Sequence, residues 1–566
     1  MEKDILSSIA NKSDESEFFT PIPDGYKVGE IKYIIVAGSV MSGVGKGIFA
    51  SSLAKLLQYY GLKVTPIKID GYLNQDAGTL NPFRHGEVYV LDDGMECDMD
   101  LGSYERFLDQ NLSKDNYLTA GIIFSRILGK ERKGGYLGRD VQFIPHVTGE
   151  IKRAVRELGM KKNADIVLVE IGGTIGDFEN AYILEAIREL KYEEGPGNVC
   201  FIDLNYIIEP PNLGEQKSKP AQSGLHRLRA LGIQPEMIVC RSVSPVTEKI
   251  REKISVYSNV PLQNVIGLHD SSTVYEASLL LKEIKADERV ADILGLKRKI
   301  NNRIQKKELD KWSTFVKTYL HAKRIIKVGI AGKYMGLLDS YASILKALEH
   351  AATHNNVRVR VKFIDTSEIE KGKKTIVEEL EDIDGLIVPG GFGVRGTEGK
   401  IDCIEYARKN DIPFLGLCFG FQMAVIEFAR NVCGLKKANS TEIEPDCKEP
   451  VISVLPEQKK IEGLGGNMRL GGKDIEVKEG TKAFELFENI KVRRRFRHRY
   501  EVDPKYIEIL EKNGMIFSGK APKHPIMQIL ELPDKKFFMA TQSHPEFASR
   551  PLRPEPMFNA FIRVIL

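Results

Sequence analysis

The apolar residues of this chain gather in short runs separated by helical patterns, and the first series of runs fills the amino-terminal half. These runs lie at 33–37, 64–69, 164–171 and 199–204. A helical pattern follows the first run, with Ile48, Ser52, Leu53, Leu56 and Leu57 at the spacing of one helix face. Apolar runs of strand length that alternate with amphipathic helices predict an α/β fold with a mainly parallel sheet.

A second series of the same kind begins after residue 324. Its strand-like runs lie at 325–330, 357–364, 385–389 and 413–417, and a helical pattern follows at 422–430. Between the two series, residues 297–323 are rich in Lys and Arg and contain the only tryptophan, Trp312. The pattern therefore predicts two doubly wound α/β domains, at 31–298 and 324–566, joined by a helical linker at 299–323. Residues 1–30 are polar and are expected to form a flexible arm.

Composition restricts the class of protein. A chain of 566 residues should contain more than one domain, and its net charge of +4 arises from 82 basic and 78 acidic residues, so nucleic acid is not an expected partner. Seven cysteines without a paired C-x-x-C spacing fit a reducing, cytoplasmic location. The longest apolar run, near 412–429, is interrupted by Gln422 and Glu427, so no membrane partner is expected.

The strongest candidate for catalysis is Cys418, which falls between an apolar strand and a helix in the sequence Gly416-Leu417-Cys418-Phe419-Gly420. Such a tight turn exposes a nucleophile, and the helix that follows favours the thiolate. His544 would act as the base and Glu546 would orient it. A lone buried cysteine is more often an inert core residue.

The glycine-rich segment 388–393 changes that assessment, because it supplies the flexible backbone N–H groups that an oxyanion hole needs. Together, the cysteine turn, this segment and the His-Pro-Glu sequence at 544–546 resemble the class I glutamine amidotransferase domain. The resemblance implies that the cysteine attacks the side-chain amide of glutamine and releases ammonia.

A second site is predicted where the strand at 33–37 runs into a glycine-rich loop and a helix. Backbone N–H groups of such a loop and its lysine hold a triphosphate, and the candidate ATP-binding residues are Gly43, Val44, Gly45, Lys46, Gly47 and Ile48. Gly47 stands where a P-loop has the Ser or Thr that binds magnesium, so the metal must be held elsewhere. Asp100 and Glu170 are the candidate Mg²⁺ ligands, and Lys68 could make a second contact to the γ-phosphate.

The wider pattern resembles the CTP synthase family. The blocks that resemble its P-loop-type, dethiobiotin-synthetase-like amidoligase domain lie at 45–47, 68–70, 85–88, 98–106, 136–138, 144–146, 170–174 and 217–220. The blocks that resemble its glutaminase domain lie at 389–393, 439–442, 464–471, 498–502 and 543–547. The resemblance covers nearly the whole chain from residue 31.

The resemblance implies a ligase of pyrimidine biosynthesis. ATP phosphorylates O4 of UTP, and ammonia from L-glutamine, carried through a channel, displaces the phosphate to give CTP. The channel would pass His85, Val88 and the turn at Leu137 and Gly138. The resemblance further implies Mg²⁺ as cofactor, CTP as feedback inhibitor, GTP as allosteric activator through the lid at 464–471, and a homotetramer.

The resemblance also implies roles for individual residues. Arg241 and Asp270 would contact ATP. Contacts to UTP would come from Ser42, Lys217, Ser218, Lys219, Pro220, Ala221, Gln222 and Lys253, and contacts to CTP from Asp177, Phe178 and Glu179. Glutamine would be held by Gly391, Phe419, Gly420, Phe421, Gln422, Glu442 and Arg499. Phe419 and Phe421 stand where the family more often has Leu and Met, and Ser218 and Ala221 replace the commoner Thr.

Two alternatives remain at this stage. A cobyrinic or cobyric acid amide synthase has the same domain order but activates carboxylates, and generally lacks the full Cys, His and Glu set. A partitioning-type P-loop ATPase would have no use for a glutaminase. The nucleotide products formed from UTP distinguish the first alternative, and an absence of glutamine hydrolysis would favour the second.

Overall fold

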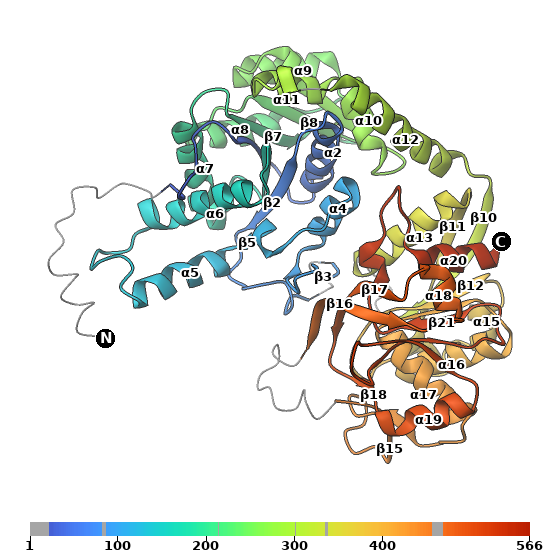
Figure 1. Cartoon of the computed structure of the whole chain (residues 1–566). Coiled ribbons are helices and arrows are strands. Elements are labelled where there is room, and N and C mark those ends of the chain that lie inside the picture. Colours follow the sequence, from blue (N-terminus) through green and yellow to red (C-terminus); the bar gives the residue numbers. More distant parts are fainter. Residues whose placement is uncertain (1–21, 82–85, 213, 300, 334–337, 455–467) are drawn as a thin grey trace. The chain divides into compact units, whose positions relative to one another are not determined.

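The computed structural model describes residues 22–81, 86–212, 214–299, 301–333, 338–454 and 468–566. The chain forms two compact units (Figure 1). The first unit contains the chain up to Thr79 and then Ser103–Val316, and the second contains Leu80–Gly102 and Lys317–Leu566. The segment Leu80–Gly102 therefore packs with the carboxyl-terminal half of the sequence, although the chain order places it in the other half.

The first unit is built on a parallel sheet of seven strands in the order β5-β2-β6-β1-β7-β8-β9. The strands are β1 (Lys32–Gly38), β2 (Val64–Asp70), β5 (Tyr117–Thr119), β6 (Ile166–Ile171), β7 (Val199–Tyr206), β8 (Met237–Ser242) and β9 (Val265–His269). Strands β2 and β6 are buried along their whole length, as expected for a sheet covered on both faces.

Helices cover both faces of this sheet (Figure 1). One face packs on α5 (Ala120–Arg132), α6 (Thr148–Lys161) and α7 (Ala181–Glu194). Helix α2 (Lys46–Tyr59) contacts β1, β2 and β6 and packs on α10 (Glu276–Glu283) and α11 (Ala286–Ile293). The unit also contains α8 (Lys219–Ala230) and α9 (Glu248–Ser258). Helices α4 (Met99–Leu108) and α12 (Asn302–His321) belong partly to the first unit and partly to the second.

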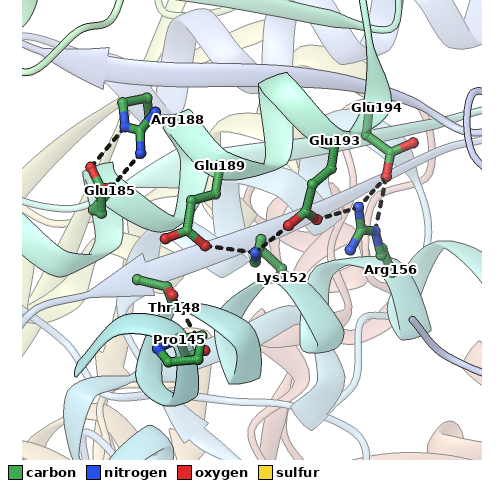
Figure 2. Close-up of polar contacts among 9 residues, drawn as sticks. All are labelled: Pro145, Thr148, Lys152, Arg156, Glu185, Arg188, Glu189, Glu193 and Glu194. Carbon is green, nitrogen blue, oxygen red and sulfur yellow. Dashed lines mark hydrogen bonds and ion pairs between the residues drawn. The ribbon is translucent and has the colours of Figure 1, made fainter. Parts of the chain in front are cut away.

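An ionic network joins α6 to α7 inside the first unit (Figure 2). Lys152 Nζ lies 2.6 Å from Glu189 and 2.5 Å from Glu193, and Arg156 donates to Glu194 at 2.6 Å. Arg156 and Glu194 have fully buried side chains, so each charge needs the other as its partner. The backbone N–H of Gly29 also donates to Glu194, which holds the end of the predicted arm against this unit.

The second unit is built on a mixed sheet of nine strands in the order β11-β10-β12-β13-β21-β20-β19-β16-β17. The pairs from β11 to β21 are parallel and the remaining pairs are antiparallel. The strands are β10 (Arg324–Gly332), β11 (Val357–Asp365), β12 (Gly385–Val388), β13 (Phe414–Leu417), β16 (Arg469–Val477), β17 (Lys491–His498), β19 (Ile516–Lys520), β20 (Met527–Glu531) and β21 (Phe538–Thr541).

Two hydrophobic cores lie against this sheet. One contains residues of α16 (Thr397–Lys409) and α17 (Phe419–Asn431), and the other contains residues of α13 (Ala342–His354) and α20 (Pro556–Ile565). The remaining elements are α14 (Thr366–Glu370), α15 (Ile376–Leu380), α18 (Lys482–Phe487), α19 (Pro504–Lys512), a small sheet of β14 (Ala438–Ser440), β15 (Glu449–Ser453) and β18 (Glu501–Val502), and a hairpin of β3 (Tyr89–Val90) and β4 (Glu96–Cys97).

The fold class predicted from the apolar runs is confirmed, because all eight runs are strands in the two sheets. The helix predicted at 422–430 begins earlier, at Phe419, so it starts directly after Cys418. The basic segment before β10 is helical, as α12, and its Trp312 is buried against Phe107, Tyr275 and Phe315 of the first unit. Strands β5, β8 and β9 of the first sheet and β16, β17, β19, β20 and β21 of the second were not predicted.

Candidate active sites

The turn at Cys418 has the strained backbone of a nucleophile elbow. Cys418 joins β13 to α17 with φ 50° and ψ −99°, in the region that non-glycine residues rarely adopt. Gly420 is required on the helix side, because a Cβ there would lie 2.1 Å from the carbonyl oxygen of Val388. The close packing of α17 on β12 therefore holds Cys418 in its strained conformation at the helix N-terminus.

His544 and Glu546 meet Cys418 as predicted. Glu546 Oε1 lies 2.7 Å from His544 Nδ1, which leaves Nε2 as the nitrogen available to the sulfur. Burial favours the neutral ring, but the Glu546 carboxylate and the Cys418 sulfur outweigh it and raise the pKa of His544 to about 10. The ring is thus protonated near neutral pH, which is the state that pairs with a thiolate.

The glycine-rich loop after β12 lies beside these groups. A Cβ added to Gly390 would lie 3.0 Å from His544 Cε1 and 3.7 Å from Cys418 Cβ, so the loop backbone approaches both side chains. A Cβ added to Gly391 would lie 4.0 Å from the Phe419 ring and 3.3 Å from Lys400 Nζ. The sequence predicts an oxyanion hole in this loop, and the structure places the loop backbone beside Cys418 and His544.

The predicted glutamine-binding residues surround the same elbow. Gln422 is buried and its Oε1 makes no hydrogen bond with any residue that the structure describes, so an acceptor is available for a bound ligand. Glu442 accepts a hydrogen bond from the Gly393 backbone, and burial raises the pKa of its carboxyl although the charges of Lys333 and Arg499 oppose that shift. Carboxylate and guanidinium groups of opposite charge suit the α-amino and α-carboxylate groups of an amino acid.

The phosphate site in the first unit has the backbone that its sequence predicts. Gly43 and Gly45 have φ values of 73° and 89°, and α2 begins at Lys46 directly after the loop. Gly47 and Ile48 form the first turn of that helix. Lys46 Nζ donates to the carbonyl oxygen of Gly173, so its charge lies between the glycine-rich loop and the end of β6.

Lys68 and Glu170 lie at the carboxyl ends of neighbouring strands, in register across β2 and β6. Their charged groups are 3.6 Å apart and both are buried. Tyr104 donates to the second oxygen of Glu170 at 2.7 Å. Among the residues described, no group of three His, Cys, Asp or Glu side chains could hold a metal by itself. A single carboxylate still fits Mg²⁺, which takes one or two carboxylates together with substrate phosphates and water.

Comparison with known proteins identifies the family. A family model described as CTP synthase N-terminus matches residues 32–296, and one described as glutamine amidotransferase class-I matches residues 336–564. The CTP synthase of Pyrococcus furiosus is 50% identical over 94% of this chain and 97% of its own length. The CTP synthase of Saccharolobus solfataricus is 46% identical over 94% of this chain and 99% of its own length. That of Methanocaldococcus jannaschii is 47% identical over 95% of this chain and 98% of its own length.

The chain belongs to the CTP synthase family. A solved glutaminase domain of the Trypanosoma brucei enzyme is 32% identical and covers 42% of this chain and 93% of its own, with a TM-score of 0.39. Family membership over both halves of the chain decides against the two alternatives that the sequence left open. In the part of the chain that the structure describes, no helix is long and apolar enough to span a bilayer.

The remaining nucleotide residues predicted from the family are only partly brought together. Arg241 Nε lies 3.7 Å from the place that a Cβ of Gly45 would take, so Arg241 lies beside the phosphate loop, and its guanidinium pairs with Asp270 at 2.7 Å. Ser218 directly precedes α8 without a capping hydrogen bond from its side chain, Lys217 lies before it, and the first turn contains Lys219, Pro220, Ala221 and Gln222. This helix packs at Gly224 against Ser39, beside the phosphate loop where Ser42 lies, whereas Lys253 is exposed on α9.

The segment predicted to contact CTP lies after β6. Asp177 is occupied by local hydrogen bonds, since its carboxylate accepts from the backbone N–H of Thr174 at 2.6 Å and from the Thr174 hydroxyl at 2.8 Å. Phe178 is 91% exposed and is free to stack on a base, and Glu179 follows it.

Asp100, the other candidate Mg²⁺ ligand, is the acidic residue in the first turn of α4. His85 and much of the lid at 464–471 lie outside the described residues.

Two residues of the glutaminase site were missed in the sequence. Gln542 is fully buried and its amide Nε2 lies 3.7 Å from Cys418 Sγ. Lys400 is buried with Nζ 4.7 Å from the centre of the Phe419 ring, and burial lowers its pKa to about 7. Gln542 stands two residues before His544, which is the one sequence signal that could have identified it. No pattern identifies Lys400, because its burial depends on the tertiary fold.

Proposed function

We propose that this protein is a glutamine-hydrolysing CTP synthase that converts ATP, UTP and L-glutamine to CTP, ADP, phosphate and glutamate. The observation that carries the proposal is the meeting of His544 and Glu546 with Cys418, which lies on a strained elbow, in a chain that also has the Lys46 phosphate loop. The amidoligase corresponds to residues 31–298 and the glutaminase to residues 324–566.

In the glutaminase reaction, the Cys418 thiolate attacks the amide carbon of glutamine. Backbone N–H groups near Gly391 stabilise the oxyanion that forms, in an environment from which water is excluded. The protonated His544, held by Glu546, gives its proton to the leaving nitrogen, and neutral ammonia departs. Water then cleaves the thioester and releases glutamate and the thiolate.

In the amidoligase reaction, Lys46 and Lys68 neutralise charge on the γ-phosphate while O4 of UTP attacks it. When bound, Mg²⁺ neutralises further phosphate charge, and Glu170 and Asp100 are the residues proposed to hold it. Phosphorylation turns O4 into a leaving group, and ammonia displaces it at C4. Ammonia in neutral water is largely protonated and is then not a nucleophile, so a channel that carries it between the sites is part of the proposal.

Regulation and assembly follow the family pattern in this proposal. CTP inhibits by feedback through Phe178 and Glu179, GTP activates through the lid at 464–471, and the protein works as a homotetramer in the cytoplasm. The support for the CTP site is the exposed aromatic ring of Phe178, which offers a stacking surface for a pyrimidine.

The test uses Cys418→Ala, which removes one sulfur atom from a turn whose shape the neighbouring glycines set. The variant should lose all glutamine-dependent CTP formation, because no other group can form the thioester. With ammonium chloride at mildly alkaline pH it should keep nearly the full rate of the unchanged enzyme. Retained activity with glutamine would refute the nucleophile, and equal loss with both nitrogen sources in a folded variant would refute two separate sites.

A further inference from the structure

The sulfur of Cys418 has polar neighbours that the catalytic triad does not include. Gln542 donates its side-chain Nε2–H toward Sγ at 3.7 Å, and the carbonyl oxygen of Arg497 lies 3.6 Å from the same sulfur. Gln542 follows β21 and is completely buried. Its backbone N–H donates to the carbonyl oxygen of Gln528 at 2.9 Å, so its position is fixed by the sheet.

The orientation of the Gln542 amide follows from the residue beside it. Gln422 Nε2 donates to the carbonyl oxygen of Tyr500 at 2.9 Å and to Gln542 Oε1 at 3.3 Å. An NH₂ group has two hydrogens and no acceptor, so turning the Gln542 amide over would place two donors against each other. The relay from Tyr500 through Gln422 therefore keeps the oxygen of Gln542 away from the sulfur and its NH₂ group toward it.

An N–H donor in this place favours the charged form of the sulfur. A hydrogen bond to an anion in a buried site is stronger than one between neutral groups, so it stabilises a thiolate more than a thiol. The amide is neutral at every pH used in an assay, so its effect does not depend on a proton of its own. Among the described residues, the charged groups that act on the sulfur are His544 and Lys400; Glu546 acts on His544, and Lys333 and Glu442 act on Lys400.

We propose that Gln542 is a catalytic residue of the glutaminase: its amide N–H stabilises the Cys418 thiolate before attack and again when the thiolate leaves. In the first step the C–S bond forms and the C–N bond breaks, with the His544 proton leaving on ammonia. In the second, water adds to the thioester, its proton passes to His544, and the C–S bond breaks to return the thiolate. This inference rests on the proposed assignment of Cys418 as the nucleophile.

The main test variant is Gln542→Glu. Glutamate has the same shape and still offers an acceptor to Gln422 Nε2, but it has no N–H to give to the sulfur when ionised. Gln542→Met is the second variant and removes both polar atoms. Gln528→Met is the matched control, because Gln528 is equally buried on the adjacent strand and its side chain has no hydrogen-bond partner among the described residues.

Three measurements are made on the full-length enzyme. They are kcat and KM for glutamine hydrolysis, ammonia-dependent CTP formation, and the rate at which iodoacetamide alkylates Cys418 from pH 5 to 10, followed by mass spectrometry of its peptide. For Gln542→Glu we expect kcat to fall about 10- to 100-fold and the alkylation midpoint to move up by about one pH unit. KM and ammonia-dependent synthesis should stay within about twofold, as should every measurement on Gln528→Met.

The outcomes separate the inference from the proposed function. An unchanged kcat or alkylation midpoint in Gln542→Glu overturns the role of Gln542, and so does an equal loss in Gln528→Met, which would make the effect one of packing. Retained ammonia-dependent synthesis shows that a variant is folded, and Gln542→Met decides the matter if the Glu variant is not. If the unchanged enzyme does not hydrolyse glutamine, the assignment of Cys418 itself has failed.

Discussion

Asp203 should make the first unit less stable as the pH rises. It lies on β7, fully buried, where Ser39 Oγ donates to one of its oxygens at 2.9 Å and Asn205 Nδ2 to the other at 2.7 Å. Burial penalises the carboxylate more than these hydrogen bonds and the charge of Lys46 favour it, and it raises the pKa of Asp203 from 3.8 to about 6.

The sign follows from comparing the folded and unfolded states. The pKa is higher in the folded protein, so folding favours the protonated carboxyl, and the stability that this provides is complete below about pH 3.8 and lost as the pH rises through about 6. Relative to low pH, the difference between the folded and unfolded pKa values lowers the free energy of unfolding by about 1.6 kcal/mol at pH 5 and about 3 kcal/mol at pH 8. The change expected between these pH values is therefore about 1.4 kcal/mol.

The variant Asp203→Asn removes the titrating group at little structural cost. Ser39 can still donate to the remaining carbonyl oxygen. Asn205 Oδ1 is buried without a partner in the described structure, so a turn of the Asn205 amide provides an acceptor for the new NH₂ group. The free energy of unfolding of the variant minus that of the unchanged protein should therefore increase by about 1.4 kcal/mol between pH 5 and pH 8.

Urea unfolding followed by tryptophan fluorescence measures this effect in the correct unit. Trp312 is the single tryptophan of the chain and is buried in the same unit as Asp203. The control is Asp292→Asn, which removes an exposed carboxylate that pairs with Lys297 at the surface of that unit. A difference between Asp203→Asn and the unchanged protein that stays constant from pH 5 to pH 8 would refute the raised pKa and the reasoning from burial.

Two further predictions test the amidoligase half. Lys46→Ala should abolish CTP formation from glutamine and from ammonia alike, since the charge of Lys46 acts on the transferred phosphoryl group. Glutamate release in the absence of nucleotides should continue. Full activity with ammonia would contradict the phosphate-loop assignment. Glu179→Ala should raise the CTP inhibition constant several-fold more than the KM for UTP, because a carboxylate accepts from the amino group of cytosine and repels the carbonyl of uracil; equal changes in steady-state assays would exclude that role.

The sequence predicted about half of the strands, and it did best where a strand is buried along its whole length, as β2 and β6 are. Runs such as Ile166–Val169 are apolar from end to end, so they stand out without an alignment. Strand β5 has three residues, Tyr117–Thr119, which is too short for any periodicity to appear. The helix at Phe419 was placed three residues late, because the apolar pattern continues through the elbow and does not show where the backbone turns.

The candidate site divides in the same way. Cys418, His544 and Glu546 were found because their chemistry and spacing are distinctive, and the structure brings them together. Gln542 and Lys400 are ordinary polar residues in the sequence, and only their burial beside the elbow makes them candidates. A buried polar side chain depends on partners from distant parts of the chain, which one sequence does not reveal.

The segment Leu80–Gly102 shows how far such partners can lie from the site in sequence. The centres of the Tyr89 and Phe547 rings are 4.7 Å apart. The Phe547 ring in turn stacks on the His544 ring, with ring centres 5.2 Å apart and an interplanar angle of 13°. Glu96 accepts from Arg497 Nε at 2.6 Å, and the carbonyl oxygen of that arginine faces the Cys418 sulfur. The base and the nucleophile are therefore both supported by a hairpin that precedes Asp100, a proposed ligand of Mg²⁺, by only a few residues. A glutaminase fragment that begins at residue 324 would lack this support.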